Sequence, residues 1–207
     1  ANGISQSIST RFFGPSEDRA GEDKIWKMYL SESKPYLLEL NYGVGNANID
    51  LSGLAIKKLK ITTGSADVKV GYYSELENQV DMDTFFVKVD LGSVDVKNMN
   101  LSRTRFVVAD VGFGNMTLDF SNKPLVSNRI KGSVGAGNLT ILLPSEDTPV
   151  LVKIQDSWLC SMKLPLGLKK IGENTFANAA YKKGANNSLV FDLDVSMGNI
   201  IFKQESH

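Results

Sequence analysis

The stretch Ile130–Pro144, IKGSVGAGNLTILLP, decides the fold. Apolar residues occupy alternate positions on both sides of Gly137, and their parity changes at that glycine. They are Ile130, Val134 and Ala136 before it, and Leu139, Ile141 and Leu143 after it. A period of two on each side indicates two β-strands. The inward-facing set slips by one residue at Gly137-Asn138, and both residue types tolerate positive φ, so we predict a bend there.

The same phrase recurs along the chain. Its copies centre on Gly45, Gly64, Gly92, Gly114, Gly137 and Gly198. The first four intervals between these glycines are 19, 28, 22 and 23 residues, a period typical of solenoid repeats. The last interval leaves room for weaker copies, one of them at Val150–Met162. In two copies the alternation before the glycine extends to Phe113 and Met197, which we expect to face the core.

Two all-β architectures satisfy this pattern. The first is a β-solenoid of about seven or eight coils, in which each Gly-Asn or Gly-Ser forms a corner. The second is an antiparallel β-sandwich in which these dipeptides close hairpins. The near-constant period and register favour the solenoid, which predicts a stacked apolar file and a polar ladder outside the corner. The file is Ile49, Val68, Val96, Leu118 and Ile141, and the ladder is Asn46, Ser65, Ser93, Asn115 and Asn138.

We predict a single domain, with an N-terminal cap segment over residues 1–35 and the solenoid repeat over residues 36–207. The open end of a solenoid needs a cover, and the segment before the repeat offers apolar side chains for one. They are Phe12, Phe13, Ile25, Trp26, Met28 and Leu30.

Two segments within the repeat domain depart from the pattern. Tyr72–Thr84 is an acidic insertion, which explains the interval of 28 residues. Pro165–Ser188 is rich in lysine, glycine and asparagine. We predict a long loop there, with a short helix near Asn174–Tyr181.

The composition excludes several partners. Lysine plus arginine and aspartate plus glutamate each number 23, so no net field attracts nucleic acid or an anionic membrane surface. No apolar run is long enough for a membrane-spanning helix, so we expect no direct membrane insertion.

Catalytic and cofactor motifs are absent from the sequence. The only histidine, His207, is the last residue and cannot anchor a Ser–His or Cys–His mechanism. Cys160 has no basic neighbour that would activate its thiol. Triplets such as Gly112-Phe113-Gly114 do not open a helix, as a dinucleotide site requires. We therefore predict no enzyme activity, no cofactor and no metal.

Four charged residues are weak candidates for surface binding. Asp67 and Asp95 occupy the same offset in neighbouring copies, and a carboxylate pair on a β-helix face is typical of a polysaccharide-cleaving or Ca²⁺ site. Arg103 and Arg105 alternate along one outer strand face, where they would meet an anionic glycan. A solvated polar face is the simpler interpretation of both pairs.

Three phrases carry a family resemblance. Tyr42–Leu54, Gly135–Pro144 and Val195–Ile201 resemble the toast-rack family of bacterial cell-envelope proteins, over about Leu37 to Lys203. Relatives in this family include adhesin head domains. The resemblance implies a right-handed β-helix-like domain in an extracytoplasmic location, periplasmic or at the cell surface, without known catalysis.

Together these observations predict a non-catalytic scaffold or interaction module of the cell envelope, adhesin-like or envelope-sensing. Its partner would be a protein or glycan of the envelope, and self-association into a homo-oligomer stays open. The alternative is a β-helix that binds or cleaves polysaccharide through Asp67, Asp95 and their neighbours.

Overall fold

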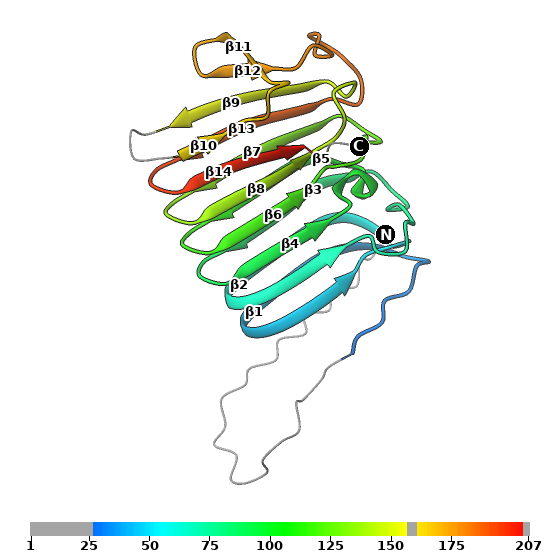
Figure 1. Ribbon diagram of the computed structural model, residues 1–207. Helices are drawn as coiled ribbons and strands as arrows, with labels where there is room; N and C mark the ends of the chain where they lie inside the picture. Colours follow the sequence, from blue (N-terminus) through cyan, green and yellow to red (C-terminus); the bar gives the residue numbers. More distant parts are fainter. Residues whose placement is uncertain (1–26, 157–160, 205–207) are drawn as a thin grey trace. The chain divides into compact units, whose positions relative to one another are not determined.

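The computed structural model describes residues 27–156 and 161–204 (Figure 1). The chain divides into two compact units, Ala1–Leu30 and Ser31–His207, and the repeat lies in the second. The predicted cap, residues 1–35, falls mostly outside the described residues, so it stays a prediction.

Strands that precede a corner form one parallel stack of the second unit. In spatial order this stack holds the first halves of β1 (Pro35–Asp50) and β2 (Ala55–Gly71), then β3 (Met82–Val89), β5 (Thr104–Val111), β7 (Asn128–Val134), β13 (Leu189–Val195) and β9 (Val150–Asp156). Strands that follow a corner form the other stack. It holds the second halves of β1 and β2, then β4 (Ser93–Lys97), β6 (Asn115–Asp119), β8 (Asn138–Leu143), β14 (Asn199–Gln204) and β10 (Ser161–Lys163).

Seven coils follow from this pairing within the described residues, in the predicted range. Each consists of a strand from the first stack and a strand from the second, joined by a corner in six of the coils, whereas the residues between β9 and β10 lie outside the described ranges; β1 and β2 pass through their corners unbroken. The Gly-Asn dipeptides therefore join strands that stack in parallel on the next coil. The solenoid is confirmed, and the antiparallel sandwich of hairpins is wrong.

The core lies between the two stacks. Inward positions alternate with outward ones as predicted, so that Val107, Ala109 and Val111 of β5 are each 1% exposed. Phe113 and Met197, which we expected to face the core, are instead 72% and 59% exposed. The alternation ends two residues earlier, because the chain has already begun to turn at Gly112 and Ser196.

The order of the coils in space differs from their order in the sequence. β13 lies between β7 and β9, parallel to both, and β14 lies between β8 and β10 (Figure 1). The last coil of the sequence, β13–β14, is therefore inserted between the coil β7–β8 and the coil β9–β10. Along the sequence, the coil β9–β10 at the far end of the stack comes first, and the coil β13–β14 that separates it from β7–β8 comes later.

The predicted register is wrong in the second coil. Asp67 of β2 lies opposite Ser93, and Val70 lies opposite Val96, so Ala66 and not Gly64 occupies the repeat position. The apolar file is therefore Ile49, Val70, Val96, Leu118, Ile141 and Phe202. The polar ladder is Asn46, Asp67, Ser93, Asn115, Asn138 and Asn199.

Close stacking, and not positive φ, explains most of the corner glycines. Among them only Gly45 has positive φ, at 102°. A Cβ on Gly114 would lie 2.4 Å from the carbonyl oxygen of Gly92, and a Cβ on Gly137 would lie 2.2 Å from that of Gly114. From Gly92 onward, successive coils thus approach through their backbones at the corner and leave no room for a side chain, whereas the second coil has Ala66 at this position.

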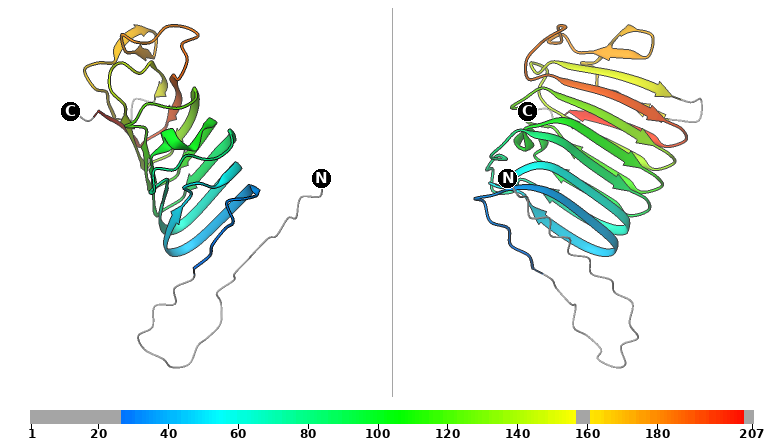
Figure 2. Two further views of the ribbon diagram at one scale, coloured as in Figure 1. Left: turned by 90° about the vertical axis from the view of Figure 1, so that its right-hand side faces the viewer. Right: turned by 180° about the vertical axis from the view of Figure 1, so that it is seen from behind.

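Pro165–Ser188 contains strands where we expected a long loop with a short helix. β11 (Lys169–Gly172) and β12 (Thr175–Ala177) form an antiparallel hairpin, and β12 pairs antiparallel with β9. Asn174 has φ 50°, a left-handed conformation that suits the tight turn between the two strands. The hairpin covers the far end of the first stack (Figure 2).

Candidate functional site

The acidic insertion neutralises the two predicted arginines. Arg103 follows the short 3₁₀ helix η1 (Met99–Ser102), and Arg105 lies in β5. Arg103 donates hydrogen bonds to Asp81 Oδ1 from Nε at 3.1 Å and from Nη2 at 2.8 Å, and its Nη1 lies 3.3 Å from Glu77 Oε2. Arg105 Nη2 lies 2.9 Å from Asp81 Oδ2. An anionic glycan would have to displace these carboxylates, so the geometry gives no support to that use.

This cluster predicts a small acid-dependent loss of stability. Hydrogen bonds from Arg103 and then Arg105 hold the pKa of the Asp81 carboxyl below its usual value. A lowered folded-state pKa contributes stability above the unfolded-state pKa, about 4, and that contribution disappears as pH falls through the folded-state pKa. Because the side chain of Asp81 is 35% exposed, we expect less than about 1 kcal/mol.

Urea unfolding at neutral pH and in acid checks this expectation. Asp81→Asn should lower the free energy of unfolding at neutral pH. In acid, the free energies of unfolding of the variant and the parent chain should differ by less than they do at neutral pH. Equal losses at both pH values would contradict the ion-pair assignment. Asp83→Asn, on the same segment, is the control.

The two predicted aspartates do not share a register. Asp67 lies opposite Ser93 and accepts a hydrogen bond from its Oγ at 2.6 Å, whereas Asp95 lies opposite Lys69. The two-residue shift of the second coil separates them into different files. Within the described residues, Asp95 Oδ1 is buried without a hydrogen-bond partner. The carboxylate pair in one register is therefore wrong, and each residue alone stays an untested candidate.

An exposed apolar ridge follows the corner, and sequence reasoning missed it. We define the corner ridge by the residue that precedes each corner position, namely Val44, Ser65, Leu91, Phe113, Ala136 and Met197. Four of these are large apolar side chains with high exposure: Val44 81%, Leu91 64%, Phe113 72% and Met197 59%. A partial signal was present in the sequence, because Val44 and Phe113 each lie between two glycines of a tight bend, whereas Leu91 and Met197 have a glycine on one side only.

The polar ladder lies beside this ridge, and its last three members are hydrogen-bonded to one another. Asn138 Nδ2 donates to Asn115 Oδ1 at 2.8 Å, and Asn199 Nδ2 donates to Asn138 Oδ1 at 2.7 Å. Side chains in successive coils are thus bonded to one another along the stack. These bonds tie together the three coils that carry Phe113, Ala136 and Met197 of the corner ridge.

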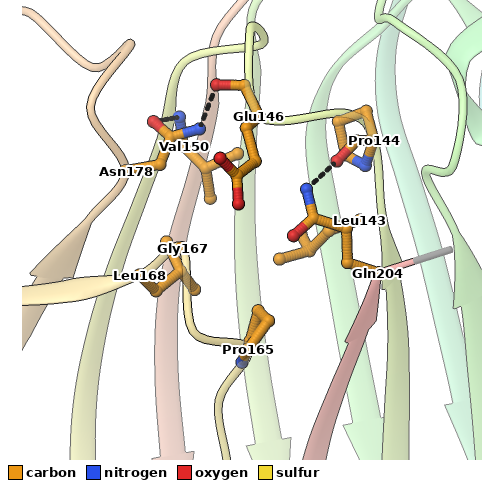
Figure 3. A pocket seen from close by; sticks show the side chains of 9 residues that line it. All are labelled: Leu143, Pro144, Glu146, Val150, Pro165, Gly167, Leu168, Asn178 and Gln204. Atoms are coloured by element: carbon orange, nitrogen blue, oxygen red, sulfur yellow. Dashed lines mark hydrogen bonds between the residues drawn. The ribbon is translucent and has the colours of Figure 1, made fainter. Parts of the chain in front are cut away.

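A small recess lies where the upper coils meet the long connection (Figure 3). Its lining includes Glu146, Asn178 and Gln204, and its free volume of about 10 Å³ suits one water molecule. Asn178 Nδ2 donates to Glu146 O at 3.2 Å, and Gln204 Nε2 donates to Pro144 O at 2.9 Å (Figure 3). These bonds tie loops together, and the recess is too small for an organic substrate.

The described part of the chain offers neither a metal-binding cluster nor a membrane-spanning helix. Residues 27–156 and 161–204 contain no group of three histidine, cysteine, aspartate or glutamate side chains arranged to hold a metal ion. The same residues include no helix with the length and apolar character needed to cross a membrane.

This chain is similar in sequence to one protein family and in structure to one solved protein. Residues 14–86 match the family described as the N-terminal domain of toast_rack, DUF2154. This confirms the toast-rack resemblance over the first coils, and the match ends within β3. The solved structure of a proposed cell adhesion protein from Clostridium sporogenes ATCC 15579 is similar at 19% identity with a TM-score of 0.49. That alignment covers 83% of this chain and 93% of the other. None of the proteins with curated descriptions matches this sequence.

Proposed function

We propose that this chain, whose residues 14–86 belong to the toast-rack N-terminal domain family, is a non-catalytic interaction module of the cell envelope. Its contact surface is the corner ridge, and its partner is an extracytoplasmic protein. The observation that carries the proposal is the alignment of Val44, Leu91, Phe113 and Met197 as exposed apolar side chains on one edge.

Exposed apolar side chains in line favour a binding role. Single exposed hydrophobic residues are ordinary on soluble proteins, whereas contiguous ones mark interaction sites. Leu91 and Phe113 lie in successive coils, about 4.8 Å apart in the stacking direction. Beside Phe113, Asn115 is hydrogen-bonded to Asn138 of the next coil, which restrains this part of the edge and lowers the entropy lost on binding.

The chemistry of this edge favours a protein over a glycan. Neither the corner ridge nor the ladder contains lysine or arginine, so the edge offers no cation to an acidic polysaccharide. Sugar binding relies on aromatic planes, and Phe113 is the single aromatic side chain of the ridge. Aliphatic and aromatic side chains beside amides suit an apolar protein segment with free backbone groups.

The polysaccharide-cleaving alternative has lost its geometric basis. It was motivated by Asp67 and Asp95 at the same offset, and β2 and β4 pair in a register that sets these two residues in different files. We therefore retain the non-catalytic proposal, together with a periplasmic or cell-surface location.

Binding to envelope fractions tests the proposal. We expect Leu91→Ser/Phe113→Ser to weaken co-sedimentation of the purified protein with bacterial envelopes about tenfold or more, because both side chains lose their apolar contact. Protease treatment of the envelopes should abolish the binding of the parent chain, and glycan-hydrolase treatment should not.

The matched control removes two exposed apolar side chains elsewhere. Leu166 and Ile171 are 100% and 61% exposed, so Leu166→Ser/Ile171→Ser should bind as the parent does. Equal binding by the ridge variant and this control would reject the corner ridge as the contact surface. Turnover of any envelope polysaccharide by the purified protein would reject the non-catalytic assignment.

A further inference from the structure

The first coil leaves one end of the solenoid open within the described residues. β1 pairs with β2 on one side, and its other edge has no strand beside it in the described part of the chain. The inward side chains of β1 are only half-buried, although those of β2 beneath them are buried. These half-buried residues are Tyr36, Leu38, Leu40, Tyr42, Ala47 and Ile49.

At the opposite end, the first stack is closed and charged. The hairpin β11–β12 pairs antiparallel with β9, and the inward residues Val150, Val152 and Ile154 of β9 are all buried. The last strand, β11, carries Lys169 and Lys170, both exposed. Lysines on a short edge strand oppose the addition of another strand. Growth of a filament by joining unlike ends is therefore disfavoured.

We propose that two copies of this chain pair head to head through the free edges of β1, around a two-fold axis. A two-fold axis makes the two β1 strands antiparallel, so the half before each corner lies against the half after the partner's corner. An isologous contact of this kind closes on itself and stops at a dimer. The proposal is independent of the function assigned to the corner ridge.

The sequence of β1 matches itself under this symmetry. Inward residues are even-numbered before the corner and odd-numbered after it. One register that sets inward against inward pairs Leu38 with Ile49 of the other copy, and Leu40 with Ala47. Apolar side chains then meet apolar side chains at these two positions of each half.

The outward side chains of the same register are also compatible. Glu39 meets Asn48 of the other copy, and Asn41 meets Asn46, so no like charges face each other. Glu39 is already neutralised within its own chain by Lys60, whose Nζ lies 2.7 Å from Glu39 Oε1. The edge strand therefore lacks the charges that protect β11.

The test exploits the outward pair of asparagines. Asn41 and Asn46 are both exposed, so their replacement should leave the fold intact. In the full chain, Asn41→Lys/Asn46→Lys sets lysine against lysine across the axis, whereas Asn41→Glu/Asn46→Lys sets glutamate against lysine. Analytical ultracentrifugation over a wide concentration range should give a concentration-dependent dimer for the parent. The lysine pair should raise the dissociation constant about tenfold or more, and the opposite-charge pair should reverse that loss.

A matched control adds two lysines far from β1. Ser133→Lys/Gln155→Lys adds the same charge on exposed positions of β7 and β9, away from β1, and should dimerise as the parent does. A parent that stays monomeric, or a dimer insensitive to both asparagine variants, overturns the proposal. Slow hydrogen exchange at the β1 amides of a monomer would assign this edge to the chain's own N-terminal residues, and would overturn it as well.

Discussion

A chain that ends at Asn187 is expected to lose the folded state of its upper coils, and not merely a fraction of its stability. This truncation removes β13 and β14, which lie between the coil β7–β8 and the coil β9–β10. The remaining chain would keep β9, β10 and the hairpin β11–β12, but the strands that support them would be gone. Residues well before the cut are therefore expected to unfold.

The size of the effect follows from what the inserted coil buries. Its inward side chains are each at most 4% exposed, and they are Leu189, Phe191, Leu193, Val195, Ile200 and Phe202. Burial of a large apolar side chain contributes about 1.5–3 kcal/mol, so their sum matches or exceeds the net stability of about 5–15 kcal/mol of an ordinary domain. Phe191 also makes edge-to-face contacts with Phe120 and Phe202, at ring-centroid distances of 5.8 and 5.5 Å.

Hydrogen exchange of individual amides checks this expectation. The amides of β9 should exchange rapidly in the truncated chain and slowly in the parent. The thermal unfolding transition of the truncated chain should have a smaller amplitude or a lower cooperativity than that of the parent. A chain that ends at Gln204 keeps the whole inserted coil and is the control. If β9 stayed protected in the shorter chain, the coil β9–β10 would have restacked directly on β7–β8, and the inserted coil would not be required.

This insertion also explains why coil order was beyond sequence reasoning. Alternation and period identified the strands, because inward positions must be apolar whichever coil lies next to them. Val150, Val152 and Ile154 of β9 carry the same pattern as Phe191, Leu193 and Val195 of β13, so either strand could stack on β7. The observed order leaves β9 as the last strand of the first stack, and the hairpin of the long connection between β10 and β13 then pairs with its free edge.

The corner ridge was missed for a related reason. Phe113 and Met197 fall on the same parity as the inward residues before them, so the period alone extended the inward set too far. Backbone stacking ends that set, since Gly112 and Gly114 both approach carbonyl groups of the preceding coil. Period alone also misplaced the second coil, where Ala66 takes the repeat position although Gly64 resembles it in sequence.

Replacement of one corner glycine is the other change with a large expected effect. A Cβ on Gly137 would lie 2.2 Å from Gly114 O, 2.8 Å from Val111 Cγ1 and 3.0 Å from the carbonyl carbon of Phe113. Two of these neighbours are backbone atoms, which cannot rotate away as a flexible side chain would. Gly137 O is in turn 2.3 Å from the position of a Cβ on Gly198, so a shift of this corner disturbs the coils on both sides. We expect Gly137→Ala to lower the free energy of unfolding by about 3 kcal/mol or more, at the upper end for overpacking.

Gly172→Ala separates this clash from the general effect of replacing glycine. Gly172 does not have positive φ, and its nearest neighbour, Thr175 Cβ, would lie at an ordinary contact distance of 3.7 Å. There the added methyl group chiefly restricts the unfolded chain, so stability should stay within about 1 kcal/mol of the parent. Urea unfolding of the three proteins measures the difference. If Gly137→Ala and Gly172→Ala were equally stable, successive corners would have room for a side chain, and the repeated glycine would need an explanation other than backbone stacking.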